Sequence, residues 1–255
     1  MALLDVTGLT KLFGGLTAVS ELNFDIQPGE LLSIIGPNGA GKTTLFNLLT
    51  GFYKPTSGTI TFNGVNITGC KPYQVTRHGM GRTFQLTSIF KQSTVLENVM
   101  IGNSLRTNVG VWGSVLRTPA TRREEQRTRE KAREILSFVG LRDKEDRVAG
   151  GLTEEAQKRL SISMALATEP KLLLLDEPTG GVNLEEISGL IELVGKIRKL
   201  GTSICLIEHK MRMVMSISDR IIVLNYGKKI AEGKPKEVAS NKEVVKAYLG
   251  ARYAA

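Results

Sequence analysis

The 255-residue sequence is poor in cysteine and aromatic residues and has no long apolar run, and each shortage excludes a class of protein. Its two cysteines, Cys70 and Cys205, are far apart, which favours a reducing compartment over a disulfide framework. Cys205 lies in the apolar run SICLI and is expected in the core. No apolar run approaches the ~18 residues of a membrane span, and the first ten residues lack the features of a secretion signal. We therefore expect a cytosolic protein.

The scarcity of aromatic residues also bears on the net charge of +9, which by itself would suggest a nucleic-acid or membrane-surface partner. The bases are mostly interleaved with acids. The densest stretch, residues 117–134, mixes seven bases with four acids and contains no aromatic residue. Such a mixture favours a solvent-facing helix over a surface that stacks on nucleotide bases. We expect no nucleic-acid partner.

Two kinds of apolar pattern predict two kinds of strand. In the first sixty or so residues apolar and polar side chains alternate, as at Leu22, Phe24 and Ile26, which is typical of an antiparallel sheet with one covered face. Continuous apolar runs predict parallel strands that are buried on both faces. These runs occupy residues 31–35, 172–175, 203–207 and 220–224.

Helical patterns separate these runs. Residues 184–201 carry apolar side chains at helical spacing and end in Gly201, a C-terminal cap. The middle of the chain has no buried-strand pattern and two expected helices, and the tail predicts one short surface helix and a frayed end. We predict a single α/β domain over residues 1–255. Its expected parts are a core with an antiparallel flank (1–86 and 161–232), a helical subdomain (87–160) and a C-terminal helix and tail (233–255).

The stretch GPNGAGKTT, residues 36–44, follows a predicted strand and precedes an apolar-faced helix. It matches the phosphate-binding loop G-x-x-x-x-G-K-[ST] in the strand–loop–helix setting that this loop requires. Gly39 and Gly41 let the backbone curl so that N–H groups point inward, towards phosphates at the positive end of the helix dipole. Lys42 supplies a cation for the β- and γ-phosphates, and Thr43 a hydroxyl ligand for Mg²⁺. The other expected ATP-binding residues are Asn38, Ala40 and Thr44.

In a second motif, LLLLDEP at residues 172–178, two acidic residues follow directly after a buried strand. They lie at the carboxyl end of the strand, where ligands bind in such folds. Asp176 is placed to hold Mg²⁺, and Glu177 to polarise an attacking water. A strand-end acidic pair alone could equally cap a helix. Combined with the phosphate loop, it predicts an enzyme that acts on a nucleoside triphosphate.

Together with RTFQ (82–85), LIEHK (206–210) and the helical insert, the two motifs make the chain resemble the ATP-binding subunit of an ABC transporter over nearly its whole length. The segments VTGLTKLFGGLTAVSELNF and GGVN and the long insert are most similar to one branch, the LivG-type ATPases of branched-chain amino acid importers. The resemblance implies a P-loop NTPase fold of the ABC ATPase type, with ATP and Mg²⁺ as cofactors.

The resemblance also implies roles that the residues alone do not establish. Phe13 would stack on adenine, although it could instead be a core aromatic. Gln85 would join the Mg²⁺ and water shell, together with Thr43 and Asp176, and link the site to membrane subunits. His209 would contact the γ-phosphate and orient water, although an isolated histidine is more often structural.

The chain departs from the family at its signature sequence. LTEEA, beginning at Leu152, occupies the place of LSGGQ: Thr153 keeps the hydroxyl and can cap a helix, but Glu154 and Glu155 replace both glycines and Ala156 the glutamine. In ABC dimers this segment closes over the γ-phosphate bound to the opposite subunit. A carboxylate in the first turn of a helix gains roughly 0.3–1 kcal/mol from the dipole. Repulsion between like charges ~4 Å apart in a partly shielded site costs about 4 kcal/mol. We expect this half-site to close poorly, unless the carboxylates turn away or become neutral.

The resemblance implies an energy-coupling ATPase that binds ATP and ADP and docks on separate permease subunits at the inner face of the cell membrane. We predict an asymmetric pair with a second ATPase, with a homodimer as the alternative, and the resemblance also implies a secreted solute-binding protein in the same system. The segment around Trp112 could touch the permease or pack within the insert. The alternatives are a nucleotide-binding subunit that never hydrolyses ATP and a soluble ABC ATPase that acts on nucleic acid. The amino acid cargo is implied by the resemblance alone.

Overall fold

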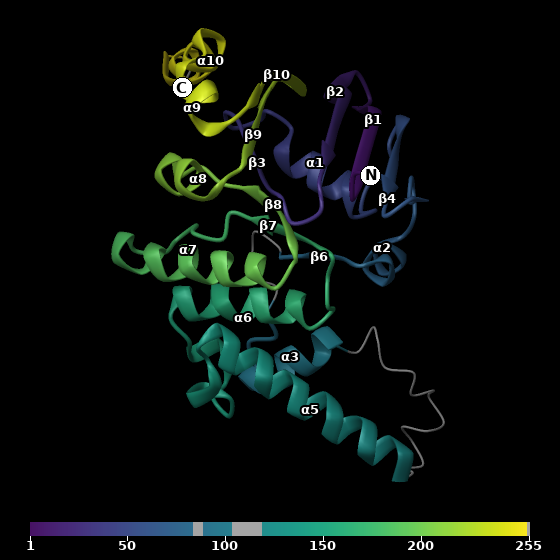
Figure 1. Ribbon diagram of the computed structural model, residues 1–255, viewed down its shortest axis with the longest axis vertical. Coiled ribbons are helices and arrows are strands. Elements are labelled where there is room, and N and C mark those ends of the chain that lie inside the picture. Colours follow the sequence, from purple (N-terminus) through teal and green to yellow (C-terminus); the bar gives the residue numbers. More distant parts are fainter. Residues whose placement is uncertain (84–88, 104–118, 254–255) are drawn as a thin grey trace.

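In the computed structural model, which describes residues 1–83, 89–103 and 119–253, the continuous apolar runs form the centre of a six-stranded sheet (Figure 1). Five strands are parallel to their neighbours, and the edge strand β10 is antiparallel to β9. The strand order is β10 (Lys228–Gly233), β9 (Arg220–Asn225), β3 (Leu31–Ile35), β8 (Ser203–Ile207), β7 (Leu172–Asp176) and β6 (Met80–Arg82).

Burial on both faces explains why these strands are continuously apolar. Side chains alternate between the two faces of a strand. In β7, Leu173 and Leu175 pack with the helical side of the molecule, whereas Leu172 and Leu174 pack with the first sheet and α1. The prediction of doubly covered parallel strands is confirmed. Cys205 in β8 is likewise fully buried and free, and burial raises the pKa of its thiol.

The alternating pattern near the N-terminus forms a separate antiparallel sheet, as predicted. Leu22, Phe24 and Ile26 of β2 are buried, and the intervening Asn23 is exposed. Helix α1 (Lys42–Leu49) packs against the inner face of this sheet through Leu45. The strand order is β2 (Leu16–Ile26), β1 (Leu4–Phe13), β4 (Ser57–Phe62) and β5 (Val65–Asn66).

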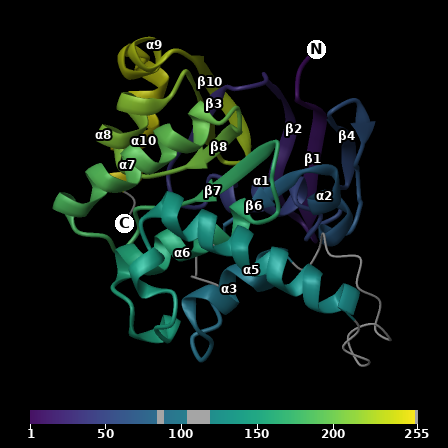
Figure 2. The same cartoon turned by 60° about the horizontal axis from the view of Figure 1, so that its bottom comes forward.

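The helices after β6 form a layer on the other side of the six-stranded sheet (Figures 1 and 2). They are α3 (Val95–Asn103), α5 (Pro119–Val139), α6 (Glu154–Leu166) and α7 (Leu184–Lys199), with short 3₁₀ turns at Arg142–Lys144 and Ala149–Gly151. Helix α6 runs through the expected subdomain boundary at residue 160, because no glycine or proline interrupts it and Ile162 and Ala165 are buried. The described part of the insert thus contributes three helices, where two were predicted. Gly201, with φ +89°, follows the end of α7 as expected.

The remaining helices are α2 (Pro72–His78), α8 (Met211–Ile217), α9 (Pro235–Ser240) and α10 (Lys242–Tyr253). The prediction of one helix in the tail was wrong, since the tail forms two. Asn241 separates them, because its side-chain oxygen accepts a hydrogen bond from the Glu243 N–H at 2.9 Å and so starts a new helix. Val238 and Val244 then pack against β9.

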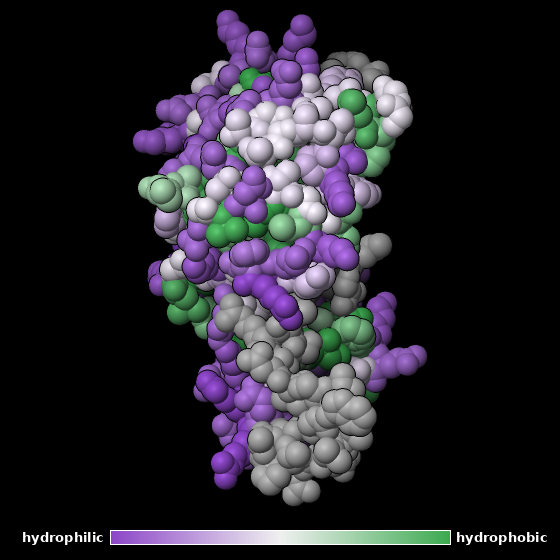
Figure 3. All heavy atoms as spheres, turned by 90° about the vertical axis from the view of Figure 1, so that its right-hand side faces the viewer, coloured by the Kyte–Doolittle hydropathy of each residue, from purple (hydrophilic) through white to green (hydrophobic). Residues whose placement is uncertain are grey.

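None of the helices within the described ranges is long and apolar enough to cross a membrane. On the face that carries the N-terminal sheet, hydrophobic side chains lie in small separate groups among hydrophilic ones (Figure 3).

We expect Leu174→Ala to lower the free energy of unfolding by about 2–5 kcal/mol, because it leaves a cavity in a doubly covered strand. Leu200→Ala, at a position 68% exposed, is the matched control and should change it by less than about 0.5 kcal/mol. Urea unfolding followed by circular dichroism measures both. Equal effects would show that β7 is not the centre of the core.

Candidate functional site

The phosphate-binding loop connects β3 to α1 and ends in a glycine whose backbone no other residue could adopt without strain. Gly41 has φ +97°, and a side chain there would overlap the carbonyl oxygen of Ala18. Gly39 also lies in the left-handed region, with φ +79°. The two glycines predicted to curl the loop therefore do so.

Lys42, the first residue of α1, folds back over this loop. Its ammonium group donates hydrogen bonds to the carbonyl oxygens of Gly36 at 2.7 Å and Pro37 at 2.9 Å. Burial lowers the pKa of Lys42, and the carboxylates of Glu177 and Asp176 oppose this effect. The cation is thus held at the mouth of the loop by carbonyl groups that phosphate oxygens can replace.

A cavity of about 960 Å³ joins the loop to distant parts of the chain. Phe13, at its edge, is 42% exposed and meets Tyr53 edge to face with ring centroids 5.2 Å apart. Phe13 is therefore not a core aromatic, although the ammonium group of Lys11 lies over its ring, 4.9 Å from the centroid. The cavity is lined by Phe13, Leu16, Thr17, Ala18, Asn38, Gly39, Ala40, Gly41, Lys42, Thr43, Thr44, Glu177, His209 and Tyr226.

Asp176 lies at the end of β7 and is 1% exposed. Its Oδ2 forms an ion pair with Arg82 Nη2 at 2.9 Å, between side chains that are 0% and 6% exposed. Burial raises the pKa of Asp176, and Arg82 counteracts this by favouring the charged form. The other oxygen, Oδ1, is buried and has no hydrogen-bond partner within the described parts of the chain.

The carboxylate oxygens of Asp176 help to decide whether Mg²⁺ fits the site. Mg²⁺ is usually held by one or two carboxylates together with waters and substrate phosphates. The unpartnered Oδ1 of Asp176 and the exposed hydroxyl-bearing side chain of Thr43 meet that requirement. The third expected ligand, Gln85, lies outside the described residues, as does Trp112.

The structure brings Glu177 and His209 together from the ends of two adjacent strands. Glu177 Oε1 lies 2.5 Å from His209 Nε2, although 32 residues separate them in sequence. The side chain of Glu177 is 19% exposed and that of His209 is 44% exposed. A carboxylate and an imidazole in contact at the wall of an open cavity can together orient and deprotonate a water molecule.

The signature segment forms the start of α6. The Thr153 hydroxyl accepts a hydrogen bond from the Ala156 N–H at 3.3 Å, so Thr153 caps the helix as predicted. Glu155 turns along its own helix and forms an ion pair with Arg159. Glu154 is exposed and lies beside Gly181 of the same chain. One of the two carboxylates is therefore neutralised by its own subunit, whereas the other remains at the helix start.

Four residues around the site were not found by sequence reasoning: Arg82, Lys158, Glu208 and Tyr226. Lys158 extends from α6, and its ammonium donates to the carbonyl oxygen of Glu177 at 3.3 Å. Burial raises the pKa of Glu208 to about 7. Arg82 and Glu208 do lie inside the quoted motifs RTFQ and LIEHK, so an acid or base at a strand end was an available signal. Lys158 is one of the basic residues that follow LTEEA, which was also a signal, whereas Tyr226 carried none.

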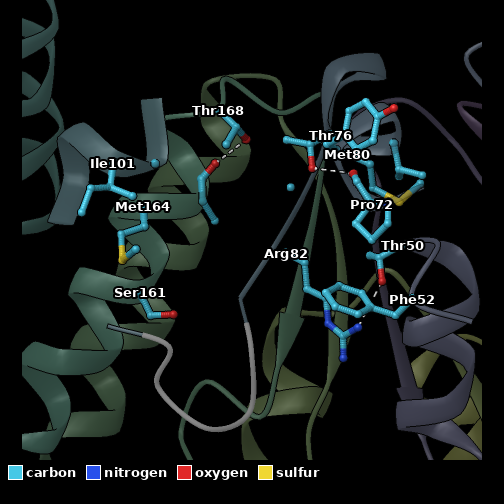
Figure 4. A pocket seen from close by; sticks show the side chains of 15 residues that line it. Thr50, Phe52, Pro72, Thr76, Met80, Arg82, Ile101, Ser161, Met164 and Thr168 are labelled. Carbon is cyan, nitrogen blue, oxygen red and sulfur yellow. Dashed lines mark hydrogen bonds between the residues drawn. The ribbon is translucent and has the colours of Figure 1, made fainter. Parts of the chain in front are cut away.

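A second cavity, of about 300 Å³, lies between the core and the helical layer (Figure 4). Thr50, Phe52 and Arg82 lie on one wall, and Ile101, Ser161 and Met164 on the other. We call this cavity the interlayer groove. The groove is connected to the nucleotide site through Arg82, because Arg82 lines the groove and also forms the ion pair with Asp176. The further lining residues are Pro72, Tyr73, Val75, Thr76, Met80, Gly81, Gly102, Ala165 and Thr168.

A phosphate loop on a parallel sheet, with an acidic strand end opposite it, defines a P-loop nucleotide-binding protein. Comparison with known families places the chain more narrowly. Residues 19–180 match the family model described as ABC transporter, and residues 228–254 match one described as branched-chain amino acid ATP-binding cassette transporter. The chain belongs to the ABC transporter ATP-binding family.

Individual relatives agree with this assignment. The chain is 43% identical to the high-affinity branched-chain amino acid transport ATP-binding protein LivG of Escherichia coli K12 and, equally, to BraF of Pseudomonas aeruginosa; each match covers 97% of this chain and 98% of the relative. It is also similar to the crystal structure of an ATP-binding cassette of an ABC transporter in its ADP conformation. That match has a TM-score of 0.86 and 34% identity, and covers 98% of this chain and 99% of the other. The resemblance inferred from the motifs and the P-loop NTPase fold are thus confirmed.

The buried carboxyl of Glu208 predicts a pH-dependent stability. Its pKa of about 7 in the folded protein lies above the ordinary value of 4.5, so the folded state binds more protons between these two values, and stability falls as the pH rises through them. Glu208→Gln cannot ionise. Its unfolding free energy relative to the wild type should therefore increase between pH 4.5 and pH 7.5, by up to about 3 kcal/mol. Urea unfolding at several pH values tests this, and parallel pH curves for the two proteins would contradict it.

Proposed function

We propose that this protein is the ATP-hydrolysing subunit of an ABC importer for branched-chain amino acids. The observation that carries the proposal is the convergence of Lys42, Glu177 and His209 on one cavity, in a chain 43% identical to LivG over nearly its full length. The cargo is inferred from the relatives' names. Selectivity for the cargo belongs to separate permease and solute-binding proteins.

The geometry supports a hydrolytic mechanism. The loop N–H groups and Lys42 bind the β- and γ-phosphates, and Phe13 stacks on the adenine at the cavity edge. Glu177 accepts the proton of the attacking water. His209, in contact with Glu177, orients that water and contacts the γ-phosphate. Lys42 and the positive end of the helix dipole stabilise the negative charge on the phosphate that is transferred. Because both are in place before the reaction, they lower the activation barrier of hydrolysis.

Mg²⁺ is the metal that this donor set fits best, with Thr43, Asp176 and Gln85 as its protein-side ligands, directly or through water. When bound, it would neutralise charge on the phosphate oxygens. Asp176 is suited to this position because one of its oxygens is held by Arg82 while the other is unpartnered among the described residues.

Permease subunits are proposed to dock at the interlayer groove on the cytoplasmic face of the membrane. Phe52, Tyr73 and Ile101 at its walls are 52%, 46% and 39% exposed, which provides an apolar surface for a permease segment. The groove also lies beside Arg82, three residues before Gln85. Occupation of the groove would influence the nucleotide site through Arg82, which lines the groove and forms the ion pair with Asp176.

We further propose that the protein works in an asymmetric pair with a second ATPase. In such a pair this protein would supply the complete set of hydrolytic residues. The second ATPase would supply an intact signature sequence. The exposed Glu154 supports the proposal, since in a homodimer it would face the triphosphate of the other copy. Pairing of Glu155 with Arg159 reduces this repulsion without removing it.

Glu177→Gln should abolish ATP hydrolysis and leave MgATP binding intact, because it removes the proton acceptor but not the phosphate loop. The expected loss is on the order of 10²–10⁴-fold. Phosphate release by the assembled transporter and calorimetric titration with MgATP measure the two properties. Unimpaired hydrolysis by the variant would exclude Glu177 as the base, and brisk turnover by the isolated wild-type chain would exclude the need for a second ATPase.

Restoring the signature glycines tests the asymmetry. The double variant Glu154→Gly and Glu155→Gly should increase ATP hydrolysis by the isolated chain at least about tenfold, because removing like-charge repulsion lets two copies close. The matched control is Glu185→Gly with Glu186→Gly, which removes an acidic pair from the first turn of α7. If both double variants behave alike, the signature carboxylates do not determine pairing.

A further inference from the structure

Glu208 is a buried carboxyl group that takes no direct part in the Glu177–His209 pair, although it immediately precedes His209 in the chain. It is 2% exposed, and its Oε1 accepts a hydrogen bond from the hydroxyl of Thr179, which is fully buried. Thr179 lies two residues after Glu177. The residue before His209 is therefore attached to the turn that follows Glu177.

Lys210, on the other side of His209, is attached to the same turn. Its ammonium donates hydrogen bonds to the carbonyl oxygens of Thr179 at 2.9 Å and Val182 at 3.1 Å. His209 thus lies between two residues that are both fixed to residues 179–182. We call this arrangement of Glu208, Lys210 and Thr179 the clasp.

The backbone of Glu177 needs such support. Its φ of +49° lies in the left-handed region, which a residue with a side chain adopts only at an energetic cost, and which persists where the surroundings determine it. The Glu177 N–H donates to the Ile207 carbonyl oxygen at 2.9 Å. Its own carbonyl oxygen accepts from the Gly180 N–H at 3.0 Å and from the Lys158 ammonium at 3.3 Å.

The clasp therefore acts on both members of the hydrolytic pair. It holds the turn that maintains the strained Glu177, and it holds the two neighbours of the His209 backbone. His209 itself is 44% exposed in its side chain, so packing alone does not fix its imidazole. Its imidazole is held by the 2.5 Å contact with Glu177.

We propose that Glu208 is a positioning residue for ATP hydrolysis, which acts through Thr179 and, with Lys210, sets the geometry of Glu177 and His209. The inference rests on the proposed hydrolytic function. Its chemistry requires a hydrogen-bond acceptor at position 208, which a glutamine oxygen can also provide. It requires no contact between Glu208 and the nucleotide.

The test compares Glu208→Ala with Glu208→Gln in the assembled transporter. Glu208→Ala should lower kcat about tenfold to a hundredfold, because a small displacement of a catalytic group has effects of this size. The dissociation constant for MgATP should change less than about twofold, since the phosphate loop is untouched. Glu208→Gln should keep kcat within about threefold of the wild type. Ser203→Ala, which removes a buried hydroxyl at the far end of β8, is the matched control and should leave both quantities unchanged.

A second measurement does not depend on activity. The chain contains two histidines, so the imidazole C–H signals of His78 and His209 can be resolved by NMR in the isolated protein. Glu208→Ala should move the His209 signal and leave that of His78, at the end of α2, unchanged. If Glu208→Ala does not fold, Lys210→Met provides the same test from the other side of the clasp.

The outcomes separate the two proposals. A wild-type transporter without ATP hydrolysis would overturn the proposed function, while the His209 signal would still report on the clasp. Hydrolysis by the wild type together with normal kcat and an unmoved His209 signal in Glu208→Ala would overturn the clasp. Loss of kcat in Glu208→Gln equal to that in Glu208→Ala, or an equal loss in Ser203→Ala, would overturn it as well.

Discussion

The pairing of β7 with β8 is the interaction on which the site depends. These parallel strands are in a register that sets Asp176 beside Ile207, and the next residue, Glu177, donates its N–H to the Ile207 carbonyl oxygen at 2.9 Å. Both strands end at this point, so the residues that follow meet at one edge of the sheet, and His209 reaches Glu177. Side chains alternate along a strand, and a shift of one residue would direct each to the opposite face.

The same edge concentrates charge in a place with little water. Lys42, Asp176 and Glu208 are at most 6% exposed, and the side chain of Arg82 is 6% exposed. An isolated buried charge is costly unless it is paired or neutralised. Here Arg82 compensates Asp176, backbone carbonyls hold Lys42, and the raised pKa of Glu208 lets it accept a proton. The site is thus electrostatically prepared for a highly charged ligand at the expense of folding stability.

The start of α6 combines a capped helix with an acidic surface. Thr153 caps the helix, and the two acids in the first turn agree with the helix dipole, so this helix start is locally favourable. The negative charge of these acids matters for a second molecule that approaches the helix start. Glu155 is paired within the chain, whereas Glu154 is exposed, which leaves a negative charge on the surface at the helix start.

Much of the fold could be predicted from the sequence, because its evidence is local. The apolar run at 31–35 gave the bounds of β3, and the glycines of the phosphate loop have the positive φ that their spacing indicated. Helix boundaries were less predictable where capping decided them. Asn241 divides the tail into two helices, although in sequence it is an ordinary polar residue.

The sequence by itself determined the chemistry of the protein, since Lys42, Asp176 and Glu177 occur in contiguous motifs whose spacing fixes their place at a strand end or a helix start. Only the tertiary structure decided which charges meet. Arg82 reaches Asp176 across 94 residues, and Glu208 reaches Thr179 across 29. Such pairs depend on which strands are neighbours in the sheet, and neighbouring strands need not be consecutive in the chain.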